Sequence, residues 1–228
     1  MTGRDPAKLG AAERAVPAIV TYQSDAGDPK AIVSLYDEVT SAFPALNILI
    51  NNAGIMRVID FNQAGRDLED LTRKISINLD GPVRMVQQFL PQLKKQKRAA
   101  IVNVSSGLAF VPLPISPIYC ATKAALHSFT QSLRVQLKKT NVQVFELAPP
   151  ATETPLMGGD FAGVDLASAH LMSVETLAKQ ALRGLEQDRL EIRPGQSNAL
   201  KLMSRIAPEF ALRQLSDDAD RMMASAKH

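Results

Sequence analysis

Short runs of apolar, often β-branched residues alternate along the chain with longer segments whose apolar residues recur at helical spacing. The runs that predict strands are residues 16–21, 46–50, 99–104 and 142–147, and the last of them carries an acidic residue, Glu146. Continuous apolar strands are typical of a parallel sheet that is covered on both faces. The pattern therefore predicts an α/β fold, a doubly wound parallel sheet whose strands are joined by right-handed crossovers.

Three longer segments, residues 30–42, 68–93 and 117–139, have the apolar periodicity of helices that cover such a sheet. Gly81 and Pro82 lie in the middle of the second segment, where we expect a kink or a break, because proline cannot continue a helical hydrogen-bond ladder. The basic run that follows this segment indicates a helix end, where cations complement the helix dipole.

The segment 149–172 is rich in proline and glycine and follows the last predicted strand. Open α/β sheets bind ligands at this edge, and long loops in compact domains are often functional. We interpret 149–172 as a substrate lid, with an ordinary surface loop as the alternative. Residues 190–228 form a C-terminal extension with two short helical signals, at 199–206 and 211–224. The whole chain is expected to be a single domain.

The composition narrows the class of protein. Of the 228 residues, 46% are hydrophobic and 21% are charged, which suits one domain with a sizeable core and excludes a disordered chain. A single cysteine, Cys120, excludes a disulfide framework and favours a reducing, cytoplasmic location. The formal net charge is only +3, and no aromatic platform accompanies the basic run, so no nucleic-acid partner is expected.

Membrane and metal chemistry are also disfavoured. No apolar run approaches the ~18–20 residues that a membrane helix needs. The three histidines and one cysteine are scattered without ligand spacing. We therefore predict neither a membrane-bound protein nor a metal site.

Polar residues follow two of the predicted strands. Tyr119 and Lys123 are four residues apart and share one face of a predicted helix. Ser106 comes just after the strand at 99–104, and Asn51-Asn52-Ala53-Gly54 follows the preceding strand in the same manner. Each motif alone is also explained as a turn or a solvated side chain. Since the carboxyl ends of parallel strands meet at one edge, we expect all of them to converge there, with Asn78 in the helix between them.

This set suits hydride transfer coupled to proton transfer at a carbonyl or an alcohol. A free tyrosine has a pKa near ~10, and a neighbouring ammonium lowers it. We therefore expect Lys123 to lower the pKa of Tyr119, which then donates a proton during reduction or removes one during oxidation. The Ser106 hydroxyl can hydrogen-bond the substrate oxygen, Asn78 can position a water that resupplies the proton, and a nicotinamide would carry the hydride.

The combined motifs resemble those of the short-chain dehydrogenase/reductase family, and the stretch 106–129 is similar to the bacterial oxidoreductases labelled DltE-like. The residues that match the family's catalytic set are Asn78, Ser106, Tyr119 and Lys123. The resemblance implies a Rossmann-like sheet and an NAD(P)(H)-dependent oxidoreductase acting on a small-molecule carbonyl or secondary alcohol. It also implies a homo-oligomer, a dimer or a tetramer, paired through the helices at 68–93 and 117–139.

The resemblance further implies which residues contact the cofactor: Arg4, Asp25, Ala26, Asn52, Ala53, Gly54, Tyr119, Lys123, Thr152 and Thr154. The pair at 25–26 would meet the adenine, residues 52–54 would line the adenosine, and the two threonines would contact the nicotinamide carboxamide. Lys123 would hold the ribose. An arginine at position 4 can pair with a 2′-phosphate, which favours NADP(H).

Two features depart from the family. Its glycine-rich turn is not found among the twelve glycines, and Pro150 stands where the family has glycine. We expect an N-terminally truncated domain that lacks the first βαβ segment of ~30–35 residues and shows an unpaired apolar sheet edge. Two explanations stay open. Either the start codon is internal to a longer protein, which we favour, or the short chain is a catalytically impaired binding or regulatory protein on the same scaffold.

Overall fold

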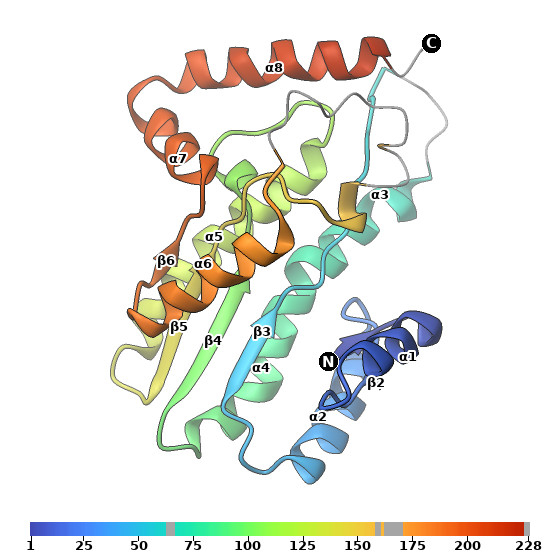
Figure 1. Ribbon diagram of the computed structural model, residues 1–228, viewed down its shortest axis with the longest axis vertical. Coiled ribbons are helices and arrows are strands. Elements are labelled where there is room, and N and C mark those ends of the chain that lie inside the picture. Colours follow the sequence, from blue (N-terminus) through green and yellow to red (C-terminus); the bar gives the residue numbers. More distant parts are fainter. Residues whose placement is uncertain (63–66, 158–160, 162–170, 226–228) are drawn as a thin grey trace.

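The computed structural model describes residues 1–62, 67–157, 161 and 171–225. Within these residues the chain forms a parallel α/β fold with helices on both faces of a central sheet (Figure 1). The predicted fold class is thereby confirmed.

The central sheet has four parallel strands in the order β3-β4-β5-β6. Its strands are β3 (Ile48–Asn51), β4 (Ala99–Val104), β5 (Val142–Leu147) and β6 (Glu191–Ile192). Residues 99–104 and 142–147 were predicted as strands with these same bounds, and the strand predicted at 46–50 is shifted toward its carboxyl end. Alternating partners such as Ile101↔Val144 bring buried β-branched side chains together across the ladder.

A second, two-stranded sheet pairs β1 (Thr2–Gly3) with β2 (Tyr22–Gln23), and α1 (Pro6–Ala15) connects them. The prediction of a strand at 16–21 is wrong, because these residues form a turn and an irregular stretch before β2. Pro17 removes a backbone donor from that run, and β1 is only long enough to pair with the two residues of β2.

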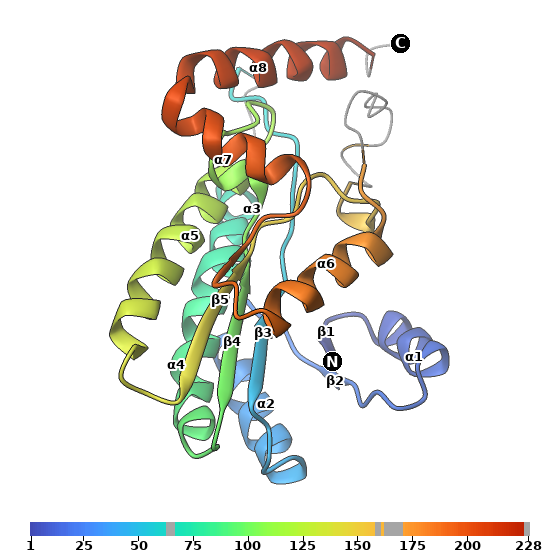
Figure 2. The same ribbon diagram turned by 60° about the vertical axis from the view of Figure 1, so that its left-hand side comes forward.

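Strand β3 lies at the edge of the central sheet, and β1 and β2 stand beside it without joining its ladder (Figures 1 and 2). The side chains of Ile48 and Ile50 on this strand are 52% and 57% exposed. The predicted unpaired apolar edge is thus present in the part of the chain that the structure describes.

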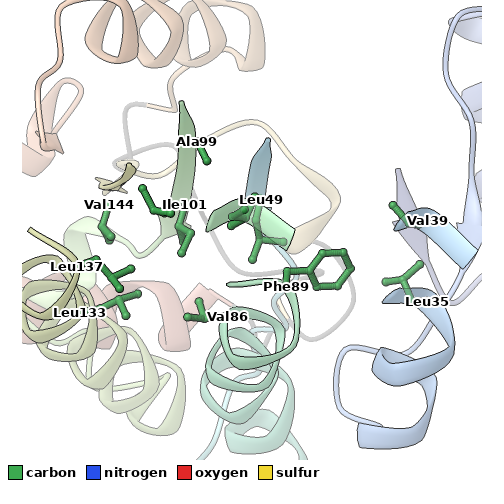
Figure 3. Close-up of a cluster of buried hydrophobic side chains, with 12 residues drawn as sticks. Leu35, Val39, Leu49, Val86, Phe89, Ala99, Ile101, Leu133, Leu137 and Val144 are labelled. Atoms are coloured by element: carbon green, nitrogen blue, oxygen red, sulfur yellow. The ribbon is translucent and has the colours of Figure 1, made fainter. Parts of the chain in front are cut away.

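The main core lies between the central sheet and three helices, α2 (Pro29–Ala42), α4 (Gly81–Lys94) and α5 (Pro117–Leu137) (Figure 3). Leu49, Ile101 and Val144 point from the strands toward the helices. The core residues on the helices are Leu35, Val39, Val86, Phe89, Leu93, Leu133 and Leu137. On the opposite face of the sheet, α6 (Val174–Glu186) packs against β6 (Figure 2). Helices α2 and α5 confirm the predicted helical segments 30–42 and 117–139, respectively, to within two residues at each end.

The third predicted helical segment is interrupted just before its Gly-Pro pair. It consists of α3 (Leu68–Ile75), a π-helical turn at Ser76–Asp80, and α4. Pro82 sits in the first turn of α4, where it cannot donate to the preceding turn, and the π turn comes immediately before this helix. Gly81 is required by a close approach, because a Cβ there would lie 2.6 Å from the carbonyl oxygen of Ala26. The π turn carries Asn78 toward the sheet.

Two helices, α7 (Gln196–Ile206) and α8 (Pro208–Ser225), lie across the carboxyl ends of the strands (Figures 1 and 2). They correspond to the two weak helical signals at the C-terminus. Much of the predicted lid, residues 158–160 and 162–170, lies outside the described residues, so the lid stays a prediction, as does the division into a single domain. None of the described helices is long and apolar enough to cross a bilayer. The predicted homo-oligomer and cytoplasmic location also stay predictions.

Candidate active site

A cavity of about 830 Å³ opens at the carboxyl ends of the central strands. The predicted site residues that line it are Asn52, Gly54, Ser106, Tyr119, Lys123, Thr152 and Thr154. They come from four separate parts of the chain, namely the loops after β3, β4 and β5 and the first turns of α5. The structure therefore brings together most of the predicted set at the edge where parallel sheets bind ligands.

The start of α5 places Tyr119 and Lys123 in this cavity. Pro117 occupies the first turn of the helix, and Ser116 ahead of it donates from its hydroxyl to the carbonyl oxygen of Arg57, 2.9 Å away. The helix start is thereby tied to the loop that follows β3. Lys123 comes one helical turn after Tyr119, and its ammonium lies 5.6 Å from the centre of the Tyr119 ring. The ammonium donates to the carbonyl oxygen of Val104 at the end of β4, at 2.8 Å.

Burial sets the proton affinities of this pair. Desolvation raises the pKa of Tyr119 to about 12, and the hydrogen bond to Ser106 lowers it only in part. Desolvation also lowers the pKa of Lys123 to about 8. The expected lowering of the Tyr119 pKa is therefore not found in this structure, because desolvation raises this pKa by more than the hydrogen bond to Ser106 lowers it. At neutral pH Tyr119 is a phenol that can donate a proton.

Ser106 follows β4, with its hydroxyl accepting from the backbone N–H of Leu108 at 3.1 Å. The next residue allows a close approach to the C-terminal helices, because a Cβ on Gly107 would lie 2.7 Å from the hydroxyl oxygen of Ser197 in α7. The loop of residues 105–107, which we call the serine loop, is thus packed directly against α7.

Asn78 is fully buried and does not line the cavity. Its amide oxygen accepts from the N–H of Ile55 at 2.9 Å, and its amide nitrogen donates to the carbonyl of Ile55 and to the hydroxyl of Thr122. These bonds join the loop after β3 to α5. The amide of Asn78 therefore holds the loop after β3 against α5, next to Lys123. A role for Asn78 in holding a water stays a prediction.

A charged cluster outside the cavity contains two of the predicted cofactor residues, Arg4 and Asp25. They follow β1 and β2, with Arg4 Nη1 3.8 Å from Asp25 Oδ2. Arg73 in the last turn of α3 places its Nη2 3.7 Å from the same oxygen. The sequence offered no signal for Arg73, since only the tertiary fold brings the end of α3 beside the loop after β2. Neither Ala26 nor Ala53 lines the cavity. The structure therefore does not bring these two predicted cofactor contacts together with Ser106, Tyr119 and Lys123.

A large part of the cavity lining comes from the C-terminal extension, where the sequence carries no recognisable motif. Its residues on α7 and α8 are Gln196, Ala199, Leu200, Met203, Ala211, Gln214, Leu215, Asp218, Arg221 and Met222. The segment after Ser106 contributes Leu108 and Leu113, and the described part of the predicted lid contributes Leu156 and Phe161. Apolar side chains thus line much of the cavity in the residues that the structure describes.

One cluster was not anticipated from the scattered histidines. Ligand-type atoms of His127, Glu146 and Glu191 lie within 4.8 Å of one another. The Lys201 ammonium donates to Glu191 at 2.9 Å and lies 3.3 Å from His127 Nε2. The Lys201 ammonium therefore already pairs with Glu191 and lies beside His127, and we assign no metal to this cluster.

The parallel sheet carries, at the carboxyl ends of its strands, one cavity that Ser106, Tyr119 and Lys123 line together. Residues 2–164 match the model of the short chain dehydrogenase family, and the chain belongs to this family. It is 42% identical over 192 residues to the "Uncharacterized oxidoreductase DltE" of Bacillus subtilis strain 168, covering 83% of this chain and 75% of that protein. The resemblance drawn from the motifs is thereby confirmed.

Solved structures agree with the fold. A short-chain dehydrogenase from Sphingobium yanoikuyae in complex with NADPH is similar, with a TM-score of 0.77 and 27% identity, covering 93% of this chain and 84% of that one. A short-chain dehydrogenase/reductase from Burkholderia phymatum in complex with NAD has a TM-score of 0.78 at 20% identity, covering 90% and 83% of the two chains.

Proposed function

We propose that this protein is an NAD(P)(H)-dependent oxidoreductase that interconverts a carbonyl compound and a secondary alcohol. One observation carries this proposal. Tyr119, Lys123 and Ser106 face one cavity in which Tyr119 is a buried phenol with a retained proton. A proton donor beside an ammonium and a hydroxyl suits general acid catalysis at a carbonyl oxygen.

The residues at this cavity fit the nicotinamide end of the cofactor, which when bound supplies the hydride. Lys123 would hold the ribose, Asn52 and Gly54 would line the adenosine side, and Thr152 and Thr154 offer hydroxyls for the carboxamide. The NADPH complex from Sphingobium yanoikuyae and the NAD complex from Burkholderia phymatum support a nicotinamide as the cofactor class.

During reduction, Tyr119 donates its phenolic proton to the substrate oxygen while the hydroxyl of Ser106 hydrogen-bonds the same oxygen. The charge that develops on this oxygen is stabilised by these two groups, which are held in place before the reaction begins. The phenolate that remains on Tyr119 is stabilised by the Lys123 ammonium one helical turn away. In the direction of oxidation the same oxygen of Tyr119 accepts the proton.

The lining favours a substrate with an apolar substituent. Leu108, Leu113, Leu200 and Met222 contribute apolar walls around the polar catalytic edge. Among ketones and aldehydes of similar size, we expect those with an apolar side group to be reduced faster than those with a charged one. The measurement is the loss of NADPH absorbance with a carbonyl panel. Failure of every carbonyl and every secondary alcohol to turn over would contradict the proposed reaction.

A calorimetric titration with NADPH separates this function from the non-catalytic alternative. Micromolar binding together with turnover supports the oxidoreductase. Binding of a nicotinamide with no turnover of any carbonyl or alcohol would instead favour a binding or regulatory protein on the same scaffold.

The cluster around Asp25 leads to a prediction about cofactor preference. Two guanidinium groups, those of Arg4 and Arg73, lie near one carboxylate and can pair with a 2′-phosphate. We expect the double substitution Arg4→Ala and Arg73→Ala to raise the KM for NADPH about 10-fold while the KM for NADH changes little. Steady-state kinetics with both cofactors tests this.

As a matched control, Arg183→Ala on α6 removes an arginine that is remote from this cluster. Equal losses with NADPH and NADH would contradict NADP(H) preference.

A further inference from the structure

A buried carboxylate that does not line the cavity joins the two elements that carry the catalytic side chains. Glu146 lies on β5 and is 0% exposed. It is the acidic exception in an otherwise apolar strand. A buried carboxylate is costly unless its oxygens are hydrogen-bonded, and each oxygen of Glu146 has a partner on a different catalytic element.

The first oxygen binds the serine loop. Ser105 donates from its hydroxyl to Glu146 Oε1 at 2.5 Å. The backbone N–H of Ser105 donates to the carbonyl of Leu147, and that of Gly107 donates to the carbonyl of Pro149, each at 2.8 Å. Ser106 lies between these two backbone bonds. The carboxylate therefore adds a side-chain restraint directly beside the catalytic serine.

The second oxygen binds α5. His127 Nδ1 lies 2.7 Å from Glu146 Oε2. Tyr119, Lys123 and His127 are spaced four residues apart, so they follow one another along the same face of the helix. The imidazole therefore anchors this face of α5 to β5, one turn beyond Lys123.

The partners of the histidine assign its tautomer. Nε2 faces the side-chain nitrogen of Gln131 at 2.7 Å and the Lys201 ammonium at 3.3 Å, and both groups are donors. Nε2 therefore accepts, and Nδ1 carries the proton that is donated to Glu146. The Phe110 ring packs edge-on against the imidazole, with ring centres 5.1 Å apart, and further restricts its orientation.

Two cations contact the second carboxylate of this cluster. The Glu191 carboxylate accepts from Lys201 at 2.9 Å and from Arg193 at 2.8 Å, and Lys201 also lies beside His127. These contacts extend the network to α7 and to the end of β6. The distinctive property of Glu146 is its reach to two elements at once, through Ser105 and His127.

We propose that Glu146 is a positioning residue that bridges the serine loop and α5, and so sets the distance between Ser106 and the Tyr119–Lys123 pair. The proposal deepens the proposed function and rests on it for its catalytic consequence. The bridge itself is a property of the fold and can be measured without a substrate.

The test compares two conservative substitutions. Glu146→Gln keeps the reach, because its amide oxygen can accept from His127 and its NH₂ can donate to the Ser105 hydroxyl, but it removes the charge. Glu146→Asp keeps the charge but is one methylene too short to contact both partners. A bridge predicts a kcat for Glu146→Gln within about threefold of the unsubstituted protein, and a kcat for Glu146→Asp that is about 10- to 100-fold lower, with KM values little changed in both. A kcat retained by Glu146→Asp and lost by Glu146→Gln would overturn the bridge in favour of charge balance.

A matched control separates positioning from general loss of stability. Thr130 is a buried residue on α5 whose hydroxyl accepts from Asn103 on β4 at 2.9 Å, without contacting Glu146. Thr130→Val is expected to lower the Tm but leave kcat unchanged. A kcat loss in Thr130→Val equal to that in Glu146→Asp would show that any weakened link to α5 slows the reaction, and would overturn a specific role for Glu146.

Thermal unfolding tests the bridge without any activity. At least one of Ser105→Ala and His127→Asn should lower the Tm much less in Glu146→Asp than in the unsubstituted protein, because the shorter side chain has already lost at least one of the two bonds. Should no carbonyl be turned over, this non-additivity would still support the bridge while the proposed function fails. Additive Tm losses would overturn the bridge whatever the activity. If Glu146→Asp does not fold, the cycle is measured with Ser105→Ala and His127→Asn in the protein that keeps Glu146. Non-additive Tm losses are expected, because both bonds hold the same side chain, and additive losses would contradict the bridge.

Discussion

Replacing Tyr119 by phenylalanine is expected to lower kcat for carbonyl reduction by about 10²- to 10⁴-fold. The substitution removes the only phenolic proton that faces the cavity among the described residues and leaves the ring in its apolar surroundings. Because Tyr119 is buried, with a pKa raised to about 12, it enters the reaction as a proton donor at every pH at which the protein is ordinarily assayed.

The measurement is NADPH consumption with a carbonyl that the unsubstituted protein accepts, together with an NADPH titration of the variant. Binding should survive, because phenylalanine retains the packing of the ring. Tyr36→Phe is the matched control, since Tyr36 is half-buried on α2 and packs edge-on against Phe89, away from the cavity. Unchanged turnover in Tyr119→Phe would show that another group supplies the proton.

The second large effect concerns Lys123 and pH. Burial lowers the pKa of Lys123 to about 8, so the ammonium is present below that pH and is lost as the pH rises through it. The ammonium stabilises the phenolate that proton transfer leaves on Tyr119. We therefore expect kcat/KM for reduction to be highest below pH 8 and to fall as the pH rises above it. The pKa of Tyr119 is too high to contribute a second step in this range.

Lys123→Met should lower kcat/KM by about 10²-fold or more and should abolish the fall near pH 8, because no titrating ammonium remains. The check is a pH–rate profile of both proteins with the same carbonyl and saturating NADPH. Lys179→Met is a suitable control, as Lys179 is an exposed residue of α6 that pairs with Glu175. A profile that keeps its alkaline limb in Lys123→Met would assign that limb to a different group.

The parts of the site that follow from local spacing could be predicted from the sequence. Tyr119 and Lys123 share a helix face because they are four residues apart, whatever the helix packs against. The strand at 99–104 could also be predicted locally, since a run of six residues, five of them apolar and one an asparagine, suits a buried parallel strand. Ser106 follows from that strand, because a residue just beyond its end must lie at the ligand-binding edge.

Other features depended on partners that are distant in the sequence. The apolar run at 16–21 was predicted to be a strand, but strand formation requires a neighbour of matching length, and β1 pairs with only two residues of β2. Arg73 joins Arg4 and Asp25 only because the end of α3 lies beside the loop after β2. Likewise, Glu146 was visible as an exception in its strand, but its contacts with Ser105 and His127 could not be inferred without the fold.

The sequence by itself determined the alternation of strands and helices, the family, and the residues that we propose supply the chemistry, since these depend on covalent order and on periodicity over one or two turns. The tertiary structure alone decided how those residues are surrounded. Whether Tyr119 gains or loses proton affinity depends on how much water surrounds it, and the packing of α8 and of the loops after β3 and β4 around its ring removes that water. Solvent exclusion is a collective property of segments that lie far apart in the chain, which is why no local motif encodes it.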